Sequence, residues 1–251
     1  MASRVILVGI GGASCSGKTL LAKHLCRLLP GALLLHQDDF CPPEKDIPVH
    51  PEHNVQDWDD PETCIDWPRL QIALQRVRET GCVEHTSNDH LNMQAEVGVD
   101  AAVATQWEER FSEMPGVRWI LVDGFVLYWD QVVADTLDVK LLLRVPKETL
   151  RARRDERSYA LQHVDDAAAG TVWMDPPGYF DNIVYPAYVK AHTAVFKDGD
   201  VEEGDVLASS GVVVIHPPPG EEGMTAALDE ACHALLAAAL GCVDAGAGES
   251  L

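Results

Sequence analysis

The stretch that most constrains this chain is a glycine-rich segment between an apolar run and an amphipathic one. Residues 12–19 fit the pattern G-x-x-x-x-G-K-[ST]. Residues 5–10 before them are almost continuously apolar, as in a buried parallel strand. Residues 20–29 after them place leucines on one helical face, and Pro30-Gly31 predicts the end of that helix. Strand, glycine loop and helix in this order indicate a phosphate-binding P-loop rather than an ordinary glycine-rich turn.

The chemistry expected of such a loop follows from its backbone. Glycines let successive N–H groups face phosphate oxygens, and the following helix N-terminus adds partial positive charge. Lys18 is expected to reach the β- and γ-phosphates, and the Thr19 hydroxyl to bind Mg²⁺. The residues predicted to hold ATP here are Gly12, Ala13, Ser14, Cys15, Ser16, Gly17, Lys18, Thr19 and Leu20.

Two further apolar runs end in carboxylates. Residues 32–35 lead to Asp38 and Asp39, and residues 117–122 lead to Asp123. Ligands of a parallel sheet bind outside the carboxyl ends of its strands, so these carboxylates are expected beside the P-loop. We predict that Asp38 accepts the proton of an attacking hydroxyl, whereas Asp39 caps a turn. Asp123 suits a Walker-B position that binds Mg²⁺ directly or through water; the alternative is a strand-end turn residue.

Apolar runs at residues 139–145 and 212–215 add two more expected strands. The predicted fold is therefore α/β, a P-loop NTPase-type parallel sheet flanked by helices, with an arginine-bearing lid. We predict a single domain over residues 1–242, a lid over about 147–175, and a disordered tail over 243–251. Residues from about 83 to 116 are interpreted as a surface insert that contains one helix near 101–111.

Charge and cysteine content narrow the partners and the compartment. The net charge of −21 argues against nucleic acid or an anionic membrane as partner. No apolar run is long enough to span a bilayer, and no segment resembles a signal peptide. Seven cysteines without a C-x-x-C pair fit free thiols in the cytoplasm. The sequence leaves the oligomeric state open, with a monomer favoured.

Two features admit more than one interpretation. The arginines at 153, 154 and 157 follow Pro146, and they suit either a lid helix over bound triphosphate or a salt-bridged surface helix. Trp58 beside Asp59 suits either a core residue with a helix cap or a stacking face with a hydroxyl acceptor.

In sequence order, the motifs resemble those of the nicotinamide riboside kinase family, within the P-loop nucleoside and uridine kinases. The resemblance covers roughly residues 5–75 and 117–195, and its more specific parts are Asp-Asp-Phe and Pro-Gly-Tyr-Phe-Asp. It rests on residues 12–19, Gln37-Asp38-Asp39-Phe40, Trp58-Asp59, Asp123-Gly124-Phe125, Arg153-Arg154-x-x-Arg157 and residues 175–181.

The resemblance implies ATP and Mg²⁺ as cofactors, a small nucleoside as substrate, and a role for each matching residue. Asp38 resembles the general base and, with Thr19 and Asp123, a magnesium ligand. Trp58 would stack on the nicotinamide ring and Asp59 would bind the ribose hydroxyls. Arg154 resembles the substrate-side arginine, and Arg153 and Arg157 the ATP-side ones. The remaining residues expected on the substrate side are Asp39, Phe40, Cys41, Trp173 and Asp175, with Tyr159 as the alternative to Trp173 for the second stacking aromatic.

Two other functions remain open on the sequence. The first is a uridine/cytidine kinase or another small-molecule P-loop kinase, although Trp58 and Asp59 offer no amide or histidine group to pair with a pyrimidine edge. The second is a nucleotide-binding regulatory protein without turnover. The joint presence of Lys18, Thr19 and Asp123 with Asp38 argues against a degenerate site.

Overall fold

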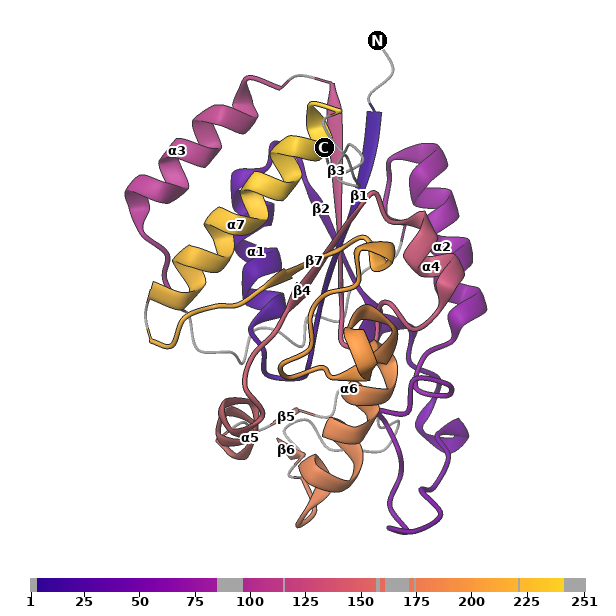
Figure 1. Cartoon of the computed structure of the whole chain (residues 1–251). Coiled ribbons are helices and arrows are strands. Elements are labelled where there is room, and N and C mark those ends of the chain that lie inside the picture. The colour runs from indigo at the N-terminus through magenta and orange to yellow at the C-terminus, as the bar shows by residue number, and fades with distance from the viewer. Residues whose placement is uncertain are drawn as a thin grey trace, which may run out of the picture.

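The computed structural model describes residues 4–84, 97–114, 116–156, 175–220 and 222–241, with the backbone of 159–160 and 172–173. Within these residues, five strands form one parallel sheet in the order β2-β3-β1-β4-β7 (Figure 1). The strands are β1 (Arg4–Gly12), β2 (Leu33–His36), β3 (Val117–Gly124), β4 (Val139–Leu143) and β7 (Val212–Ile215). Each of them coincides with one of the predicted apolar runs, which confirms the predicted parallel α/β sheet.

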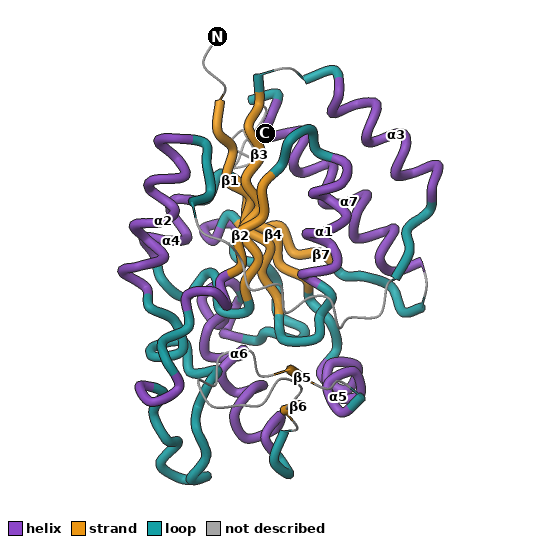
Figure 2. The backbone as a smooth tube through the Cα atoms, turned by 180° about the vertical axis from the view of Figure 1, so that it is seen from behind, coloured by secondary structure: helices purple, strands orange, loops and turns teal. Residues whose placement is uncertain are grey.

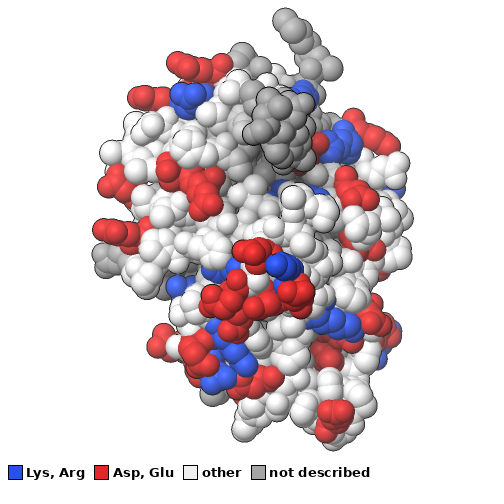
Figure 3. All heavy atoms as spheres, viewed as in Figure 1, with Lys and Arg blue, Asp and Glu red and all other residues white. Residues whose placement is uncertain are grey.

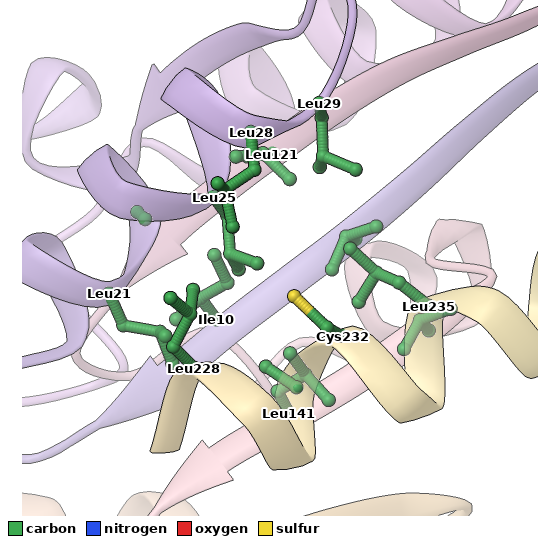
Figure 4. Packing of buried hydrophobic residues seen from close by; sticks show 14 of the residues in the cluster. Ile10, Leu21, Leu25, Leu28, Leu29, Leu121, Leu141, Leu228, Cys232 and Leu235 are labelled. Carbon is green, nitrogen blue, oxygen red and sulfur yellow. The ribbon is translucent and has the colours of Figure 1, made fainter. Parts of the chain in front are cut away.

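Helices cover both faces of this sheet, as Figures 1 and 2 show. One face carries α1 (Lys18–Leu28), α3 (Ala101–Ser112) and α7 (Glu222–Ala239), and the other carries α2 (Trp67–Thr80) and α4 (Gln131–Thr136). Alternate residues of a strand face opposite sides, so Ile6 and Val8 join the first core cluster whereas Leu7 joins the second. In the first cluster, the leucines of α1 and α7 converge on Ile10 and Leu141 (Figure 4).

Local capping explains where α2 begins and ends. The Asp66 carboxylate accepts the Arg69 N–H at 3.1 Å, and Pro68 stands in the first turn, where a missing N–H has no cost. Gly81 then adopts φ 68°, which stops the helix. Asp66 and Pro68 therefore set the start of α2 at Trp67.

The segment interpreted as a surface insert differs from that interpretation. The predicted helix is present as α3, but its Trp107 and Phe111 are almost fully buried in the core under α7 and α1. The Trp107 indole N–H also donates to Asp229 of α7 at 2.8 Å. The described residues 97–114 therefore form a third helix of that layer, because an aromatic pair at i, i+4 gives α3 a buried face.

The remaining elements lie beyond the carboxyl ends of the strands (Figure 1). They are α5 (Lys147–Asp155), the short strands β5 (Tyr159–Ala160) and β6 (Val172–Trp173), a π-helical turn (Phe180–Val184) and α6 (Tyr185–His192). Short 3₁₀ turns occupy Gln37–Phe40, Glu44–Asp46, Thr193–Val195, Lys197–Gly199 and Ala208–Ser210. Residues 243–251, predicted as a disordered tail, lie outside the described residues.

The surface agrees with the acidic composition. On the face seen in Figure 3, Lys and Arg side chains lie among more numerous Asp and Glu side chains. Among the helices described, none combines the length and the apolar character that crossing a bilayer requires.

Candidate active site

The P-loop, residues 12–19, connects β1 to α1 and depends on unusual backbone angles. Gly12 and Gly17 have φ values of 148° and 96°, and Cys15 has a φ of 67°. A Cβ at position 12 would lie 2.7 Å from Ser16 Oγ and 3.0 Å from the Leu143 carbonyl oxygen, so only glycine fits there. Positive φ values turn neighbouring N–H groups of a loop to one concave side, which is how backbone nests bind anions.

The first turn of α1 completes this loop. Gly17 is the N-cap and supplies no side-chain acceptor, so the N–H groups at this end have no side-chain cap. Lys18 and Thr19 are the first residues of the helix, and Thr19 is buried. Ser16 Oγ is also buried and has no hydrogen-bond partner among the described residues. A helix N-terminus of this kind attracts phosphate.

Helix α5 brings its arginines to the P-loop. Arg153 Nη1 donates to the Cys15 carbonyl at 3.2 Å. Arg154 is buried, and its Nη1 donates to Ser14 Oγ at 2.8 Å. The other side of the same guanidinium donates to both oxygens of Asp175, at 2.5 and 3.2 Å. Arg154 therefore joins the P-loop to the segment that follows the lid.

That segment, Asp175 to Asp181, is fastened to α5 at both ends. Asp175 binds Arg154, whereas Asp181 pairs with Arg151 and with Lys147. The three α5 residues in these ion pairs, Lys147, Arg151 and Arg154, are spaced i, i+4, i+7 and share one face of the helix. The lid-helix interpretation and the salt-bridge interpretation thus both describe part of α5: Arg153 and Arg154 meet the P-loop, and Arg151 pairs with Glu148 and Asp181.

The predicted strand-end carboxylates lie on the edge of the sheet that carries the P-loop. Asp38 is exposed in the turn that directly follows β2. Asp123 is buried near the end of β3, and the register of the two strands places it directly opposite His36. His36 Nδ1 lies 3.1 Å from Asp123 Oδ2. The side chain of the next residue, Gln37, accepts the Val126 N–H at 3.1 Å. Two side-chain contacts therefore join the ends of β2 and β3.

The charges around Asp123 favour its ionised form. Burial alone would raise the pKa of Asp123, but the hydrogen bond from His36, the charge of Lys18 and the Thr19 hydroxyl together lower it. Burial likewise opposes ionisation of His36, yet Asp123, followed by Asp38 and Asp39, raises the pKa of this imidazole. Lys18 and Thr19 of the P-loop therefore lie close enough to Asp123 to act on its charge.

A second group of polar residues forms a buried cluster, here called the Tyr179 cluster: Asp57, Trp58, Asp59 and Tyr179. The Tyr179 hydroxyl lies 3.4 Å from Asp59 Oδ2 and accepts the Trp58 N–H at 3.4 Å. Asp57 Oδ1 accepts the N–H groups of Asp59 at 3.1 Å and Asp60 at 2.9 Å, which fixes the turn. Trp58 itself is half-buried. The cluster thus contains a half-buried tryptophan directly before a buried aspartate in the chain.

Asp59 has a strongly perturbed pKa. Burial, countered in part by Arg154 and reinforced by Asp57 and Asp175, raises it to about 6. A buried carboxylate with few donors is expensive to ionise, and such groups concentrate at functional sites.

The residues between Asp38 and the Tyr179 cluster have different environments. Cys41 is partly exposed, and burial together with the charges of Asp38 and Asp59 raises the pKa of its thiol. Cys41 is therefore close enough to both carboxylates for their charges to act on its thiol. Phe40, in contrast, is buried in the second core cluster with the Arg69 guanidinium 4.9 Å from its ring centroid, and Arg69 also donates to the Asp39 carbonyl. Phe40 accordingly packs beneath the turn.

Some predicted residues lie outside the described part. Arg157 is one of them. For Tyr159 and Trp173 only the backbone is described, and it pairs these two residues directly opposite each other in β5 and β6. The two candidates for the second stacking aromatic therefore occupy one register position of the lid.

The residues present fit a magnesium ion. Mg²⁺ takes oxygen ligands, keeps several waters and uses one or two carboxylates. Asp123 Oδ1 is buried without a hydrogen-bond partner among the described residues, and the Thr19 hydroxyl is nearby. No group of three His, Cys, Asp or Glu side chains in the described residues forms a protein-only metal site. The ring nitrogen Nδ1 of His50, which could otherwise bind a metal, accepts two backbone N–H groups of its own loop.

The sequence alone indicates no role for His36 or Tyr179. Tyr179 lies within the motif at residues 175–181, and His36 directly precedes Gln37-Asp38-Asp39-Phe40, but the contacts of the two residues depend on strand register and on a distant turn. His36 had a usable signal, since it ends one strand of a sheet in which the neighbouring strand ends in a carboxylate.

Comparison with known proteins adds independent information. The chain is 34% identical over 236 residues to the nicotinamide riboside kinase of Eremothecium gossypii, with 93% of each chain covered. It is 32% identical to the nicotinamide riboside kinase of Saccharomyces cerevisiae, which covers 79% of this chain and 82% of that protein. Nicotinamide riboside kinase 2 of Homo sapiens is 28% identical over 74% of this chain and 66% of its own length. A scan against models of protein families finds no match.

Proposed function

Because the chain belongs to the nicotinamide riboside kinase family, we propose that it transfers the γ-phosphate of ATP to the 5′-hydroxyl of nicotinamide riboside. The observation that carries this proposal is the position of Arg154. Its guanidinium joins Ser14 of the P-loop to Asp175, and its charge acts on Asp59 of the Tyr179 cluster. A phosphate site and a buried polar cluster that share one arginine suit the transfer of a phosphoryl group between two bound molecules.

The phosphate side would act by position and charge. The P-loop N–H groups and the first turn of α1 would bind the β- and γ-phosphates, and Lys18 with Arg153 would neutralise the charge that develops on them. Thr19 and Asp123, with Asp38, would hold Mg²⁺, which when bound would neutralise negative charge on the β- and γ-phosphates. Asp38 would accept the proton of the 5′-hydroxyl.

The Tyr179 cluster would bind the nucleoside. Nicotinamide riboside carries a positive charge on its ring, and a tryptophan face attracts a cation by about 1–2 kcal/mol when partly desolvated. Trp58 is half-buried and directly precedes the buried Asp59, and an indole and a carboxylate together would suit a cationic ring and ribose hydroxyls. Nicotinic acid riboside, which adds a carboxylate to the ring, is the second acceptor to compare.

The product would be nicotinamide mononucleotide, a pyridine nucleotide of NAD biosynthesis. The proposal includes a cytoplasmic location and a monomeric enzyme. Thiols that form no disulfide bond within the described residues support the location: Cys26, Cys41, Cys64, Cys82 and Cys232.

The test is ADP release from MgATP with four acceptors: nicotinamide riboside, nicotinic acid riboside, uridine and cytidine. We expect turnover of the pyridine ribosides well above that of the two pyrimidine nucleosides, and loss of turnover without Mg²⁺. Faster turnover of uridine or cytidine would replace the acceptor assignment by a pyrimidine nucleoside kinase. ATP binding without turnover of any acceptor would favour the nucleotide-binding regulatory protein.

A further inference from the structure

The contact between His36 and Asp123 follows from strand register. His36 is the last residue of β2, Asp123 is the next-to-last residue of β3, and the parallel ladder pairs them directly. Paired residues of adjacent strands project to the same face of the sheet. The two side chains are 12% and 5% exposed, and 3.1 Å separates His36 Nδ1 from Asp123 Oδ2. The imidazole therefore donates from Nδ1 to a buried carboxylate.

The two oxygens of Asp123 have different surroundings. Oδ2 accepts from His36, whereas Oδ1 is buried and has no hydrogen-bond partner among the described residues. A buried carboxylate oxygen without a donor is costly, so a ligand or its water is expected there. The P-loop residues Lys18 and Thr19 are the neighbours whose charge and hydroxyl act on this carboxylate.

We propose that His36 is a positioning residue for the magnesium site: by occupying Oδ2, it leaves Asp123 with one oxygen, Oδ1, for the hydration shell of the nucleotide-bound metal. This inference rests on the proposed function only in taking a magnesium-bound nucleotide as ligand. His36 itself touches neither the metal nor the nucleotide. Hydrogen-bond partners of this kind fix the orientation of metal-binding carboxylates, and their loss typically weakens metal affinity by roughly 10–100-fold.

The residue type is matched to the geometry. The Nδ1 atom of histidine and the Nδ2 atom of asparagine are both two bonds from Cβ. His36→Asn therefore keeps a donor at nearly the same place, whereas His36→Leu keeps a comparable volume and removes the donor. His24 is a suitable control, because it is also buried and hydrogen-bonded, at 2.9 Å to the Val97 carbonyl, away from this edge of the sheet.

The experiment measures Mn²⁺ binding to the full-length protein with ADP by electron paramagnetic resonance, with no acceptor present. We expect His36→Leu to weaken Mn²⁺ binding by at least about 10-fold, His36→Asn to restore most of it, and His24→Asn to match the wild type. Metal-free ADP binding should be unchanged in all four proteins. In an Asp123→Asn background, His36→Leu should have no further effect.

Unchanged Mn²⁺ affinity in His36→Leu would overturn the proposal. An equal loss in His36→Asn and His36→Leu, with equally lowered melting temperatures, would also overturn it, since the role would then be packing. The readout needs no phosphoryl transfer. A wild-type protein that binds MnADP but does not phosphorylate nicotinamide riboside would refute the proposed acceptor and leave this test intact.

Discussion

The P-loop and the Tyr179 cluster lie on the same edge of the sheet, but different forces hold them. The P-loop is shaped by backbone angles, with positive φ at Gly12, Cys15 and Gly17, between a central strand and a core helix. The Tyr179 cluster is held by side-chain hydrogen bonds between residues about 120 positions apart in sequence. Its central carboxylate, Asp59, is buried and costly to ionise.

This difference predicts that the P-loop tolerates substitution, whereas the Tyr179 cluster determines ligand selectivity. A loop that binds phosphate through its backbone tolerates many side chains and accepts any nucleoside triphosphate with the right phosphates. A ligand site built from side chains, as we propose for the Tyr179 cluster, would choose its ligand by side-chain chemistry, at a cost in stability. Substitutions on the two sides should therefore differ in which property they change.

The largest effect is expected at Lys18, on the phosphate side. Lys18→Ala should reduce turnover at least about 1,000-fold. The substitution removes the positive lysine charge that would stabilise the transferring phosphoryl group in a site shielded from water. The melting temperature should change little, since Lys18 is not a core residue. Steady-state kinetics and thermal unfolding measure both, with Lys23→Ala on the same helix as control. A mild kinetic effect would mean that the loop is structural.

Asp38 should come next. Asp38→Ala should lower kcat at least about 100-fold, because a general base typically contributes roughly 10²–10⁴-fold. ATP affinity should be retained, as calorimetry with a non-hydrolysable analogue would report. Asp46→Ala, an exposed aspartate in a neighbouring turn, is the matched control. Near-normal turnover of Asp38→Ala would remove the base assignment and leave positioning as the main source of catalysis.

Trp58 tests the selectivity of the Tyr179 cluster. Trp58→Ala should raise the KM for nicotinamide riboside about 10-fold, because the loss of a cation–π contact of ~1–2 kcal/mol corresponds to that factor. The KM for ATP should stay the same, and Trp58→Phe should recover part of the loss. Equal changes in both KM values would indicate a folding defect instead of a lost contact.

Substitution of Asp59 should have the smallest kinetic effect of the four, and it should stabilise the fold. Its pKa of about 6 lies above the ordinary 3.8, so between these values the folded chain binds a proton that the unfolded chain does not. Stability from this group therefore increases as the pH falls through 6, and ionised Asp59 destabilises the fold at neutral pH. Asp59→Asn should raise the unfolding free energy at pH 7 by about 1–3 kcal/mol.

The same substitution should raise the KM for the acceptor several-fold. It should also flatten the decline in kcat/KM for the acceptor that wild type is expected to show below pH 6, where protonation of Asp59 removes an acceptor oxygen. Denaturant unfolding at pH 7 and pH 4 checks the stability part, and the gain should be smaller at the lower pH. A destabilised Asp59→Asn protein at pH 7 would contradict the claim that the ionised carboxylate is costly.

The P-loop side of the site could be predicted from the sequence more fully than the Tyr179 cluster. The strands and the P-loop were readable, because apolar runs and a glycine pattern are local signals. The burial of Trp107 and Phe111 was missed, since polar residues surround them and only the i, i+4 spacing showed a buried face. His36 and Tyr179 were missed because their partners are set by strand register and by a distant turn. Local pattern does not specify such pairings.

Arg154 belongs to both sides at once, through Ser14 and Asp175. We therefore expect a substitution at Arg154, predicted as the substrate-side arginine, to alter the Michaelis constants of both substrates. Variants with a new acceptor preference are therefore to be sought at Trp58 and Asp59. Arg154 contacts both parts of the site, so such a redesign has to leave it unchanged.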